Sequence, residues 1–205
     1  MPRNTLLHLS LINVNISPND VLLFDMDGTL IHTDNANNIA YKLAIRDVLG
    51  EIPDDLFNNI YRIRQVDVRN AIKNISEEQF NQIVTYKKEY YKKNISATYL
   101  IDNVVDLLKL HHKTHKCILV SDACSDRVIQ TLEYFNLKNI FYAIITKEDC
   151  IDNENKFTSA IRKFKLNPNE IWVFENEQEN IEKALELNVK HLILKDNENF
   201  YYLSK

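Results

Sequence analysis

Residues 21–30 constrain this chain more than any other segment. An apolar run, Val-Leu-Leu-Phe, leads directly into Asp25-Met-Asp27-Gly28-Thr29. The 205-residue chain contains only two glycines, and one of them is Gly28. Glycine lets a backbone leave a strand through a conformation that is closed to other side chains. The sequence therefore predicts a buried strand that ends in a turn beside two carboxylates.

The spacing of Asp25 and Asp27 suggests what these carboxylates do. Residues two apart on an extended segment point the same way, so both side chains are expected to share one space. Carboxylates at close quarters separate their titrations, which suits one to stay anionic while the other carries a proton. One can attack and the other can donate. The alternative is a strand-end turn with two solvated aspartates, because Asp-Gly pairs are common in turns.

The segment from residue 34 to 97 is expected to contain helices and no strand, because its apolar residues recur at steps of three and four. The predicted helices are one over 35–49 that Gly50 ends, one after Pro53 marked by Leu56, Ile60 and Ile63, one over 66–72, and one opened by the capping box Ser76-Glu77-Glu78-Gln79. The segment therefore has the pattern of a small helical bundle inserted after the first strand.

The rest of the chain alternates between helix and strand. Strands are predicted at 117–120, 140–145, 171–174 and 191–194, and helices at 99–111, 125–135, 156–165 and 177–187. Strands separated by helices pair in parallel, with helices on both faces. The predicted fold class is α/β: a doubly wound parallel sheet formed by residues 1–33 and 98–205, with a helical domain at 34–97.

Several polar residues fall at the ends of predicted strands, where such sheets bind ligands. Asp25, Ser121 and the pair Glu175-Asn176 are expected on one rim of the sheet. The Ser121 hydroxyl, with the following helix N-terminus, can hold a phosphoryl oxygen, although an N-cap serine has the same pattern. Lys156 opens a later helix and can neutralise a phosphoryl group; it can equally be a surface lysine, and Lys147 is the weaker candidate.

These segments resemble the motifs of the haloacid dehalogenase (HAD) superfamily of phosphohydrolases. The decapeptide 21–30 is similar to the first motif, and Ser121 and Lys156 stand at the places of the second and third. Residues 173–184, Val-Phe-Glu-Asn-Glu-Gln-Glu-Asn-Ile-Glu-Lys-Ala, resemble the fourth motif of the branch that contains beta-phosphoglucomutase-like phosphatases, without gaps. The helical insertion stands where one class of the superfamily carries its cap.

The chain also departs from the family pattern at three positions. Asp122 stands where the family often has Asn or Ser, and an extra acid there can weaken phosphate binding. Asn176 stands where the branch has a metal-binding Asp, and Asn180 replaces a Gly or an acid. An amide oxygen can replace a carboxylate as a magnesium ligand, although with one less negative charge.

The resemblance implies phosphoryl transfer from a small phosphorylated metabolite through an aspartyl-phosphate. Asp25 is then the nucleophile and Asp27 the acid and base, while Ser121 and Lys156 hold the phosphoryl oxygens. Dehalogenase members share the nucleophile but typically lack the second acid, so Asp27 favours a phosphate substrate. Further assignments that the resemblance implies are substrate binding by Gly28, Thr29 and Asp122, and Mg²⁺ ligation by Asp25, Asp27, Asn176 and Glu175.

Composition limits the other function classes. The formal charge of −4 and the pI near 5.9 give no general reason to bind nucleic acid or an anionic membrane. No apolar run approaches the ~20 residues that span a bilayer. The three cysteines lack zinc-type spacing, which favours a cytoplasmic protein. The stretch 6–12 is expected to be an extra strand or short helix, not a signal peptide.

Two further clusters have a structural and a functional interpretation. The segment 86–93 interleaves lysines with tyrosines as single-strand binders do, but its helical spacing favours rings on one side and solvated lysines on the other. His111, His112 and His115 suggest metal binding, but a solvated turn at a helix end is the favoured interpretation. Arg62, Arg64 and Arg69 are candidates for gripping a second anionic group or are surface charges.

Two alternatives to a phosphatase stay open at this stage. A phosphomutase would use the same residues with a bisphosphate intermediate. A catalytically weakened binding or regulatory protein on the same scaffold is suggested by Asp122, Asn176 and Asn180. The substrate and the oligomeric state do not follow from the sequence.

Overall fold

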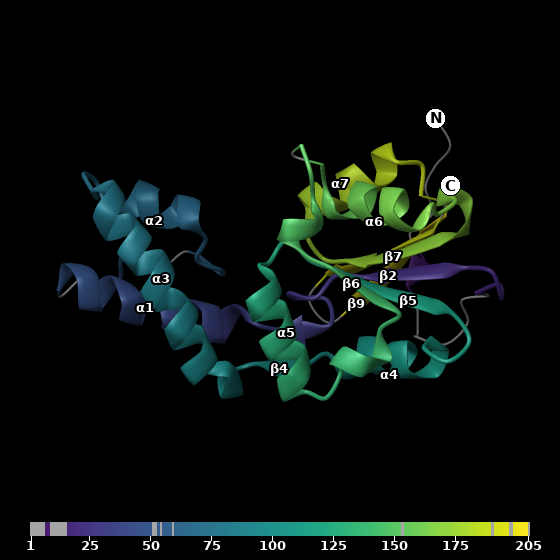
Figure 1. The fold of residues 1–205 in the computed structure, drawn as a ribbon, viewed down its shortest axis with the longest axis horizontal. Helices are drawn as coiled ribbons and strands as arrows, with labels where there is room; N and C mark the ends of the chain where they lie inside the picture. The colour runs from purple at the N-terminus through teal and green to yellow at the C-terminus, as the bar shows by residue number, and fades with distance from the viewer. Residues whose placement is uncertain are drawn as a thin grey trace. The chain divides into compact units, whose positions relative to one another are not determined.

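The computed structural model describes residues 7–8, 16–50, 53, 55–58, 60–152, 154–189, 191–196 and 199–204 (Figure 1). The chain divides into two compact units. One comprises Met1–Ile31 with Leu100–Lys205, and the other comprises His32–Tyr99. Each unit is described by itself below.

The first unit is built on a seven-stranded sheet within the described residues. Its strand order is β1-β9-β8-β7-β2-β5-β6. The five parallel strands are β2 (Val21–Phe24), β5 (Lys116–Val120), β6 (Ala143–Ile145), β7 (Ile171–Glu175) and β8 (His191–Asp196). Two antiparallel strands, β9 (Asn199–Ser204) and β1 (Leu7–His8), extend the β8 edge. The predicted parallel α/β sheet is therefore confirmed. Strand β9 was not predicted, whereas β1 lies in the stretch 6–12, for which a strand or a short helix was expected.

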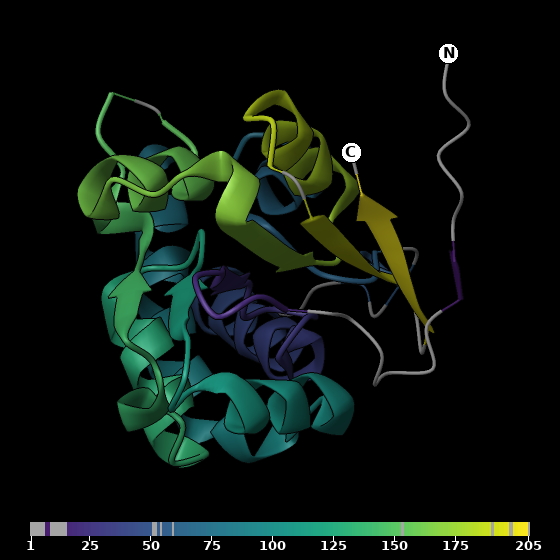
Figure 2. The same ribbon diagram turned by 90° about the vertical axis from the view of Figure 1, so that its right-hand side faces the viewer.

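Helices cover both faces of this sheet, as the alternation of strand and helix predicts (Figure 2). On one face, the β2 residues Leu22 and Phe24 pack with α4 (Asp102–His111) and α5 (Ser125–Tyr134). On the other face, Val21 and Leu23 pack with α6 (Lys156–Phe164) and α7 (Gln178–Glu186). All four strand residues are buried, because a central parallel strand has no solvated face.

The strand order makes β2 the topological switch point. After β2 the chain builds outward through β5 and β6, then crosses back to β7 on the other side of β2 and continues to β8. Ligands bind outside the carboxyl ends of the strands at such a point, because the adjacent connections leave in opposite directions. Asp25 follows β2 directly, so the fold places it at this position.

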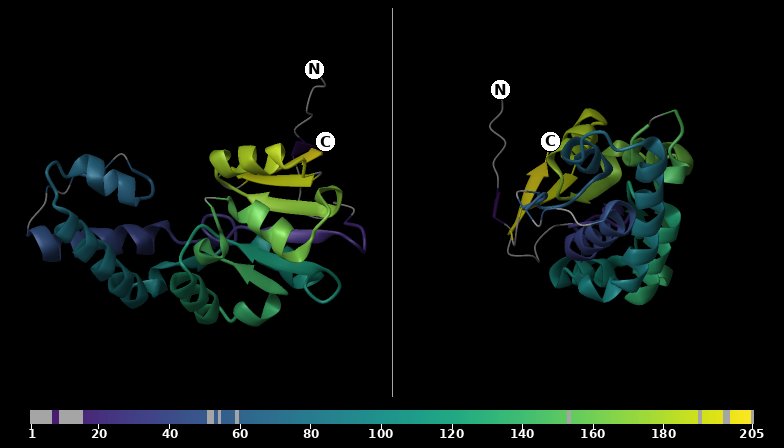
Figure 3. Two further views of the ribbon diagram at one scale, coloured as in Figure 1. Left: turned by 45° about the horizontal axis from the view of Figure 1, so that its top comes forward. Right: turned by 90° about the vertical axis from the view of Figure 1, so that its left-hand side faces the viewer.

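The described residues of the second unit form three α-helices, α1 (Asp34–Leu49), α2 (Gln65–Ala71) and α3 (Glu77–Lys93), and a 3₁₀ turn over Ile95–Ala97. Helices α1 and α3 lie side by side (Figure 3) and bury a small apolar core that includes Ile45, Phe57, Ile63 and Ile83. The capping box before α3 is confirmed: the Ser76 hydroxyl accepts from the Gln79 N–H, and the Gln79 side chain accepts from the Ser76 N–H, both at 3.1 Å. The short strands β3 (Ile31–His32) and β4 (Tyr99–Leu100) pair where the chain passes between the two units.

The predicted helix after Pro53 is wrong. The described residues there form a turn at 55–58 and an irregular segment at 60–64. Side chains of α1 satisfy that backbone: the Asn37 amide donates to the Ile63 carbonyl, and the Asn38 amide oxygen accepts from the Ile63 N–H, each at 2.8 Å. Because these bonds replace helical ones, the apolar side chains reach the core without a helix.

Other predicted elements are confirmed with shifted ends. The helix expected from residue 99 begins at Asp102, after β4, and the strand expected from residue 140 begins at Ala143, after a 3₁₀ turn over Lys138–Ile140. Part of the stretch 6–12 lies outside the described residues. Across the part of the chain that is described, no helix is both long enough and apolar enough to cross a bilayer.

A buried polar contact between Asp20, which directly precedes β2, and Trp172 provides a test of the core. One carboxylate oxygen of Asp20 accepts from the indole N–H of Trp172 at 2.7 Å and from the Ser17 N–H at 2.8 Å. Asp20→Ala leaves the buried indole donor unsatisfied, so we expect the free energy of unfolding to fall by about 1–3 kcal/mol. Trp172 is the chain's single tryptophan, and its fluorescence during urea unfolding reports the change.

The matched control is Asp106→Ala, an exposed aspartate in the middle of α4. This change is expected to stay within about 0.5 kcal/mol of wild type. Equal stability of both variants would show that the indole contact contributes nothing.

Candidate active site

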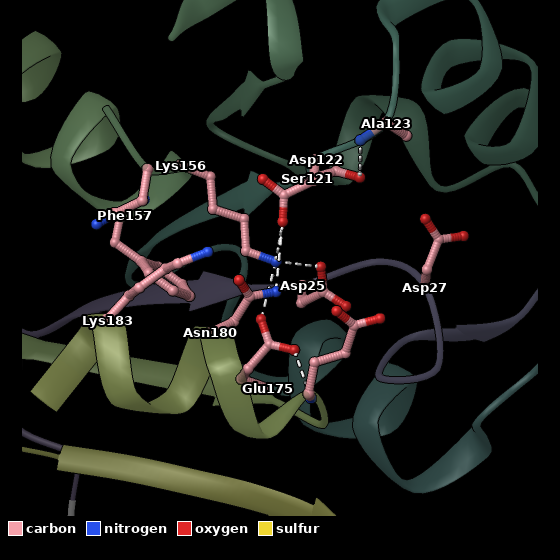
Figure 4. Close-up of polar contacts among 12 residues, drawn as sticks. Asp25, Asp27, Ser121, Asp122, Ala123, Lys156, Phe157, Glu175, Asn180 and Lys183 are labelled. Atoms are coloured by element: carbon pink, nitrogen blue, oxygen red, sulfur yellow. Dashed lines mark hydrogen bonds and ion pairs between the residues drawn. The ribbon is translucent and has the colours of Figure 1, made fainter. Parts of the chain in front are cut away.

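Asp25 lies at the end of β2 with its carboxylate inside the protein. Its N–H donates to the Phe174 carbonyl at 3.0 Å, which extends the pairing of β2 with β7 by one residue. Its side-chain oxygen Oδ1 accepts from the ammonium of Lys156 at 2.7 Å (Figure 4). The residue is only 4% exposed, so this contact is screened little by water.

Lys156 is the centre of a cluster of acids. It is the first residue of α6 and is 2% exposed, and its ammonium lies 2.7 Å from Asp25, 2.8 Å from Glu175 and 3.4 Å from Asp122. Burial alone would lower the pKa of this lysine, but the three carboxylates together hold it well above its usual value. The Asn155 side chain caps α6 by accepting from two backbone N–H groups. This cap sets the start of the helix and therefore the position of Lys156.

Glu175 connects this cluster to the loop after β7. Its oxygen Oε1 accepts from the backbone N–H groups of Asn176 and Glu177, both at 2.9 Å. The other oxygen, Oε2, is buried without a hydrogen bond of ordinary geometry, although the Lys156 ammonium lies close to it. Glu175 is thus fully buried, shapes the loop with one oxygen and pairs with the lysine through the other.

The surroundings of Asp25 oppose its ionisation. Burial is the largest influence and, together with the charges of Glu175 and Asp27, raises the pKa of Asp25 well above its usual range, while Lys156 acts in the opposite direction. A nearby positive charge would stabilise the ionised form of such a buried carboxylate. Perturbed groups of this kind cluster at functional sites, although structural ion pairs produce them too.

The turn after Asp25 is fixed by a contact with the β7 loop. Gly28 has φ of +82°, a conformation that favours glycine. The buried hydroxyl of Thr29 donates to the Asn176 side-chain oxygen at 2.8 Å. A Cβ on residue 28 would stand 2.5 Å from the Asn176 side-chain nitrogen, so only glycine fits there without a shift. The turn after Asp25 and the loop after β7 therefore hold each other in place.

Ser121 and Asp122 occupy the turn after β5. The Ser121 hydroxyl is buried and accepts from the Ala123 N–H at 3.2 Å, and its own N–H donates to the Ile145 carbonyl. The Asp122 side chain is largely exposed, contacts Lys156, and accepts from the Asn180 amide at 3.3 Å. Ser121 therefore sits on the expected rim, where its hydroxyl orders the turn. Lys147 is exposed in a separate 3₁₀ turn, so Lys156 is the lysine that meets Asp25.

Asp27 does not face Asp25 as the two-residue spacing suggested. Its two carboxylate oxygens accept from both terminal nitrogens of Arg127, at 2.7 and 2.5 Å. Figure 4 shows its carboxylate beyond Asp25 and away from the Lys156 ammonium. The strand ends at Phe24, so the alternation of an extended segment no longer applies at residue 27. A guanidinium also matches a carboxylate in a fork geometry, which favours this orientation.

Sequence reasoning missed Arg127 entirely. It is the third residue of α5, six positions after Ser121, and its side chain is about as buried as that of Asp27. Its position at the start of the helix that follows β5 was the available indication. An arginine in the first turn of a helix is nevertheless too common to mark a partner 100 residues away.

The charges of the cluster are compatible with a divalent cation. Four carboxylates, of Asp25, Asp27, Asp122 and Glu175, face the two cations Lys156 and Arg127, which leaves a formal charge of −2. Oxygen donors with excess negative charge suit Mg²⁺, which usually keeps several water ligands. Within the described ranges no three His, Cys, Asp or Glu side chains converge as a ready-made metal site, so an ion here would rely on water or substrate oxygens as well.

The fold and this cluster define an α/β protein with a buried carboxylate at the switch point of its sheet. Comparison with family models gives a match over residues 22–194 to the haloacid dehalogenase-like hydrolases. The chain belongs to this family, as the sequence motifs suggested. A search of the curated proteins gave no match.

Solved structures with the same fold carry related names. A predicted phosphoglycolate phosphatase of Haemophilus somnus aligns with a TM-score of 0.72 and 19% identity, over 88% of this chain and 85% of that one. A haloacid dehalogenase-like family hydrolase of Streptococcus pneumoniae aligns at 0.68 and 16%, over 84% and 83%. A beta-phosphoglucomutase of Clostridium difficile aligns at 0.64 and 19%, over 83% and 82%. At these identities the likeness concerns the fold.

The glycine of the Asp25 turn can be tested against the second glycine of the chain. Gly28→Ala places a methyl group on the Asn176 side chain and forces alanine into a positive φ, so we expect a loss of about 1–2 kcal/mol from the backbone and on the order of 1–3 kcal/mol from the contact. The free energy of unfolding, measured in urea, should reveal both.

Gly50→Ala is the control for backbone strain without a contact. Gly50 has φ of +84° and ψ of −152°, and a Cβ there would meet nothing within 4 Å, so we expect a loss of about 1–3 kcal/mol from the backbone alone. A loss in Gly28→Ala that does not exceed about 1–2 kcal/mol, the backbone term alone, would contradict the contact between Gly28 and Asn176.

The pair of Asp27 and Arg127 can be measured by a double-mutant cycle. Arg127→Met leaves the Asp27 carboxylate without its fork of donors, so we expect a loss of about 1–3 kcal/mol in the free energy of unfolding. In the Asp27→Asn background the same change should cost less, with a coupling energy of about 0.5–3 kcal/mol. A coupling energy of zero would show that the two side chains are not paired in solution.

Proposed function

We propose that this chain is a phosphatase that hydrolyses a small phosphorylated metabolite through an aspartyl-phosphate on Asp25. The observation that carries the proposal is the buried ion pair of Asp25 and Lys156 at the carboxyl end of the central strand. A lysine there can stabilise the charge of a phosphoryl group as it approaches the nucleophile. Family membership and the phosphatase names among the structural neighbours support the same reaction class.

The first half of the proposed reaction transfers the phosphoryl group. A carboxylate oxygen of Asp25 attacks phosphorus, the bond from phosphorus to the leaving oxygen breaks, and Asp27 gives its proton to that oxygen. Asp27 must first carry a proton and leave the Arg127 fork, since an ionised carboxylate bound through both oxygens cannot donate. Ser121 and Lys156 are assigned to the phosphoryl oxygens.

The second half releases phosphate. Asp27, now ionised, takes a proton from a water that attacks phosphorus, and the bond between phosphorus and the Asp25 oxygen breaks. Asp25 returns as a carboxylate and inorganic phosphate leaves. Because Arg127 donates to both Asp27 oxygens in the structure, each of the two proton transfers would require the Asp27 carboxylate to turn from Arg127 toward the phosphoryl group.

Mg²⁺ is the proposed cofactor. The residues that would hold it are Asp25, Asp27, Asn176 and Glu175. When bound, the ion offsets the negative charge of the phosphoryl group and of the carboxylates. Gly28, Thr29 and Asp122 are assigned to substrate binding; of these, Thr29 acts through the position of Asn176.

The helical unit is proposed to act as a cap that selects the substrate and excludes water. Two of its candidate arginines are already paired within the unit: Arg62 donates to Asp34 at 2.6 Å, and Arg69 donates to both oxygens of Glu77. An anionic substrate group would have to compete with these carboxylates. The chain's free cysteines fit a cytoplasmic enzyme.

A second candidate is a binding or regulatory protein on the same scaffold. It is favoured by the fork on Asp27 and by the amide at position 176, whose oxygen already accepts from Thr29. A phosphomutase is a variant of the enzyme that needs a bisphosphate intermediate. Calorimetry with Mg²⁺ and beryllofluoride separates the classes, since only the enzyme is expected to bind this phosphoryl analogue in a manner that depends on Asp25.

The proposed function predicts opposite effects of Asp25→Asn on turnover and on stability. Release of phosphate from a panel of phosphomonoesters with Mg²⁺ should fall to background, because the amide cannot attack phosphorus. The raised pKa of Asp25 means that its ionisation destabilises the folded state as pH rises through and above the usual aspartate range. The neutral amide removes this effect and leaves Lys156 paired with Glu175 and Asp122, so stability at neutral pH should increase.

The melting temperature of Asp25→Asn at neutral pH, compared with that of wild type, measures this gain. The two readouts together exclude misfolding as the cause of lost turnover. Phosphate release that persists in a well-folded Asp25→Asn variant, or that is absent from wild type on every ester, would contradict the proposal.

A further inference from the structure

A pair of histidines lies at the amino end of strand β5, opposite the carboxyl ends that carry the candidate active site. His111 is the last residue of α4, and His115 directly precedes β5, whose far end carries Ser121. The His115 N–H donates to the His111 carbonyl at 2.9 Å, so the turn between them keeps the helical spacing of four residues. Both side chains are partly exposed.

The two imidazole rings face each other through the same kind of nitrogen. The Nδ1 atoms of His111 and His115 are 3.3 Å apart, and the ring planes are nearly perpendicular at 78°. A contact between two like nitrogens needs one proton, and the other nitrogen must present its lone pair. The pair thus holds at least one ring nitrogen ready to accept.

The backbone assigns which nitrogen this is. The Nε2 of His115 lies 3.2 Å from the Ser17 carbonyl, an acceptor only, so Nε2 carries the proton and Nδ1 presents the lone pair. The Thr114 hydroxyl lies 2.8 Å from that Nδ1 and has the His111 carbonyl at 3.2 Å as another acceptor. Metal-binding histidines are oriented in the same way, by a carbonyl on the distal ring nitrogen.

We propose that His111 and His115 bind a divalent transition-metal ion of the Zn²⁺, Ni²⁺ or Cu²⁺ class through their Nδ1 atoms. Two nitrogens on one tetrahedral zinc, at about 2.0–2.1 Å from the metal, lie roughly 3.3 Å from each other, so the spacing of the pair already fits. The proton between the rings moves to Nε2 of His111, and none is released.

The donor set separates this site from the candidate active site. Imidazole nitrogen suits zinc, nickel and copper, whereas Mg²⁺ requires oxygen ligands. Burial and the neighbouring His115 lower the pKa of His111, which favours the neutral ring that binds metal. Among the described residues no third His, Cys, Asp or Glu joins the pair, so water fills the remaining positions.

Calorimetric titration of the full chain with Ni²⁺ and with Zn²⁺ tests the site. The background is Cys124→Ser Cys150→Ser, which removes the two partly exposed thiols, and excess Mg²⁺ is present to compete for the carboxylate cluster. We expect one ion per chain, with affinity reduced at least about tenfold by His111→Ala or by His115→Ala. His112→Ala, in the same turn but outside the pair, is the matched control and should bind as the background does.

A second measurement guards against loss of fold. Saturating Ni²⁺ should raise the melting temperature of the background protein and of His112→Ala, but not of the other two variants, whose melting temperatures without metal should stay near that of the control. Binding that survives the combined His111→Ala His115→Ala change would overturn the proposal, as would the absence of binding or equal weakening by His112→Ala.

Discussion

The ion pair of Lys156 with buried acids is the constraint on which the rest of the site depends. A lysine this deep cannot remain charged unless carboxylates surround it, and carboxylates this deep cannot ionise without it. The segments that supply these groups are the ends of β2, β5 and β7 and the start of α6, so the cluster forms only when these three neighbouring strands have paired and α6 packs beside them. Such a cluster contributes little net stability compared with apolar packing, which points to a chemical reason for its presence.

The sequence predicted those parts of the molecule that depend on local pattern. The apolar run of β2, the glycine after Asp27 and the capping box at Ser76 are each decided within a few residues, and all were found. The fork of Arg127 on Asp27 and the bond of Thr29 to Asn176 join residues 100 and 147 positions apart. No periodicity encodes such pairs, so the direction in which Asp27 points could not be derived.

The amide at position 176 has a physical consequence for the charge of the site. The cluster already carries two more negative than positive groups, and a carboxylate at 176 would add another beside Glu175. Asparagine keeps an oxygen at that place without the charge, and its amide group is fixed between Thr29 and the bare backbone of Gly28. If Asn176 is a magnesium ligand, as proposed, it offers an amide oxygen with a weaker attraction for the cation than a carboxylate would have.

The pair of Asp27 with Arg127 sets what the proposed reaction would require of the site. Arg127 donates to both oxygens of Asp27, whereas the proposed proton transfer would need at least one of them beside the leaving oxygen of the substrate. Thr29 and Gly28 hold the turn that carries Asp27 against the β7 loop, so release from Arg127 is expected to involve the Asp27 side chain alone. An incoming phosphoryl group carries negative charge that can compete for the same guanidinium. In the proposed reaction, substrate binding and the release of Asp27 are thus expected to be coupled, because a guanidinium that binds phosphate through both terminal nitrogens no longer binds Asp27.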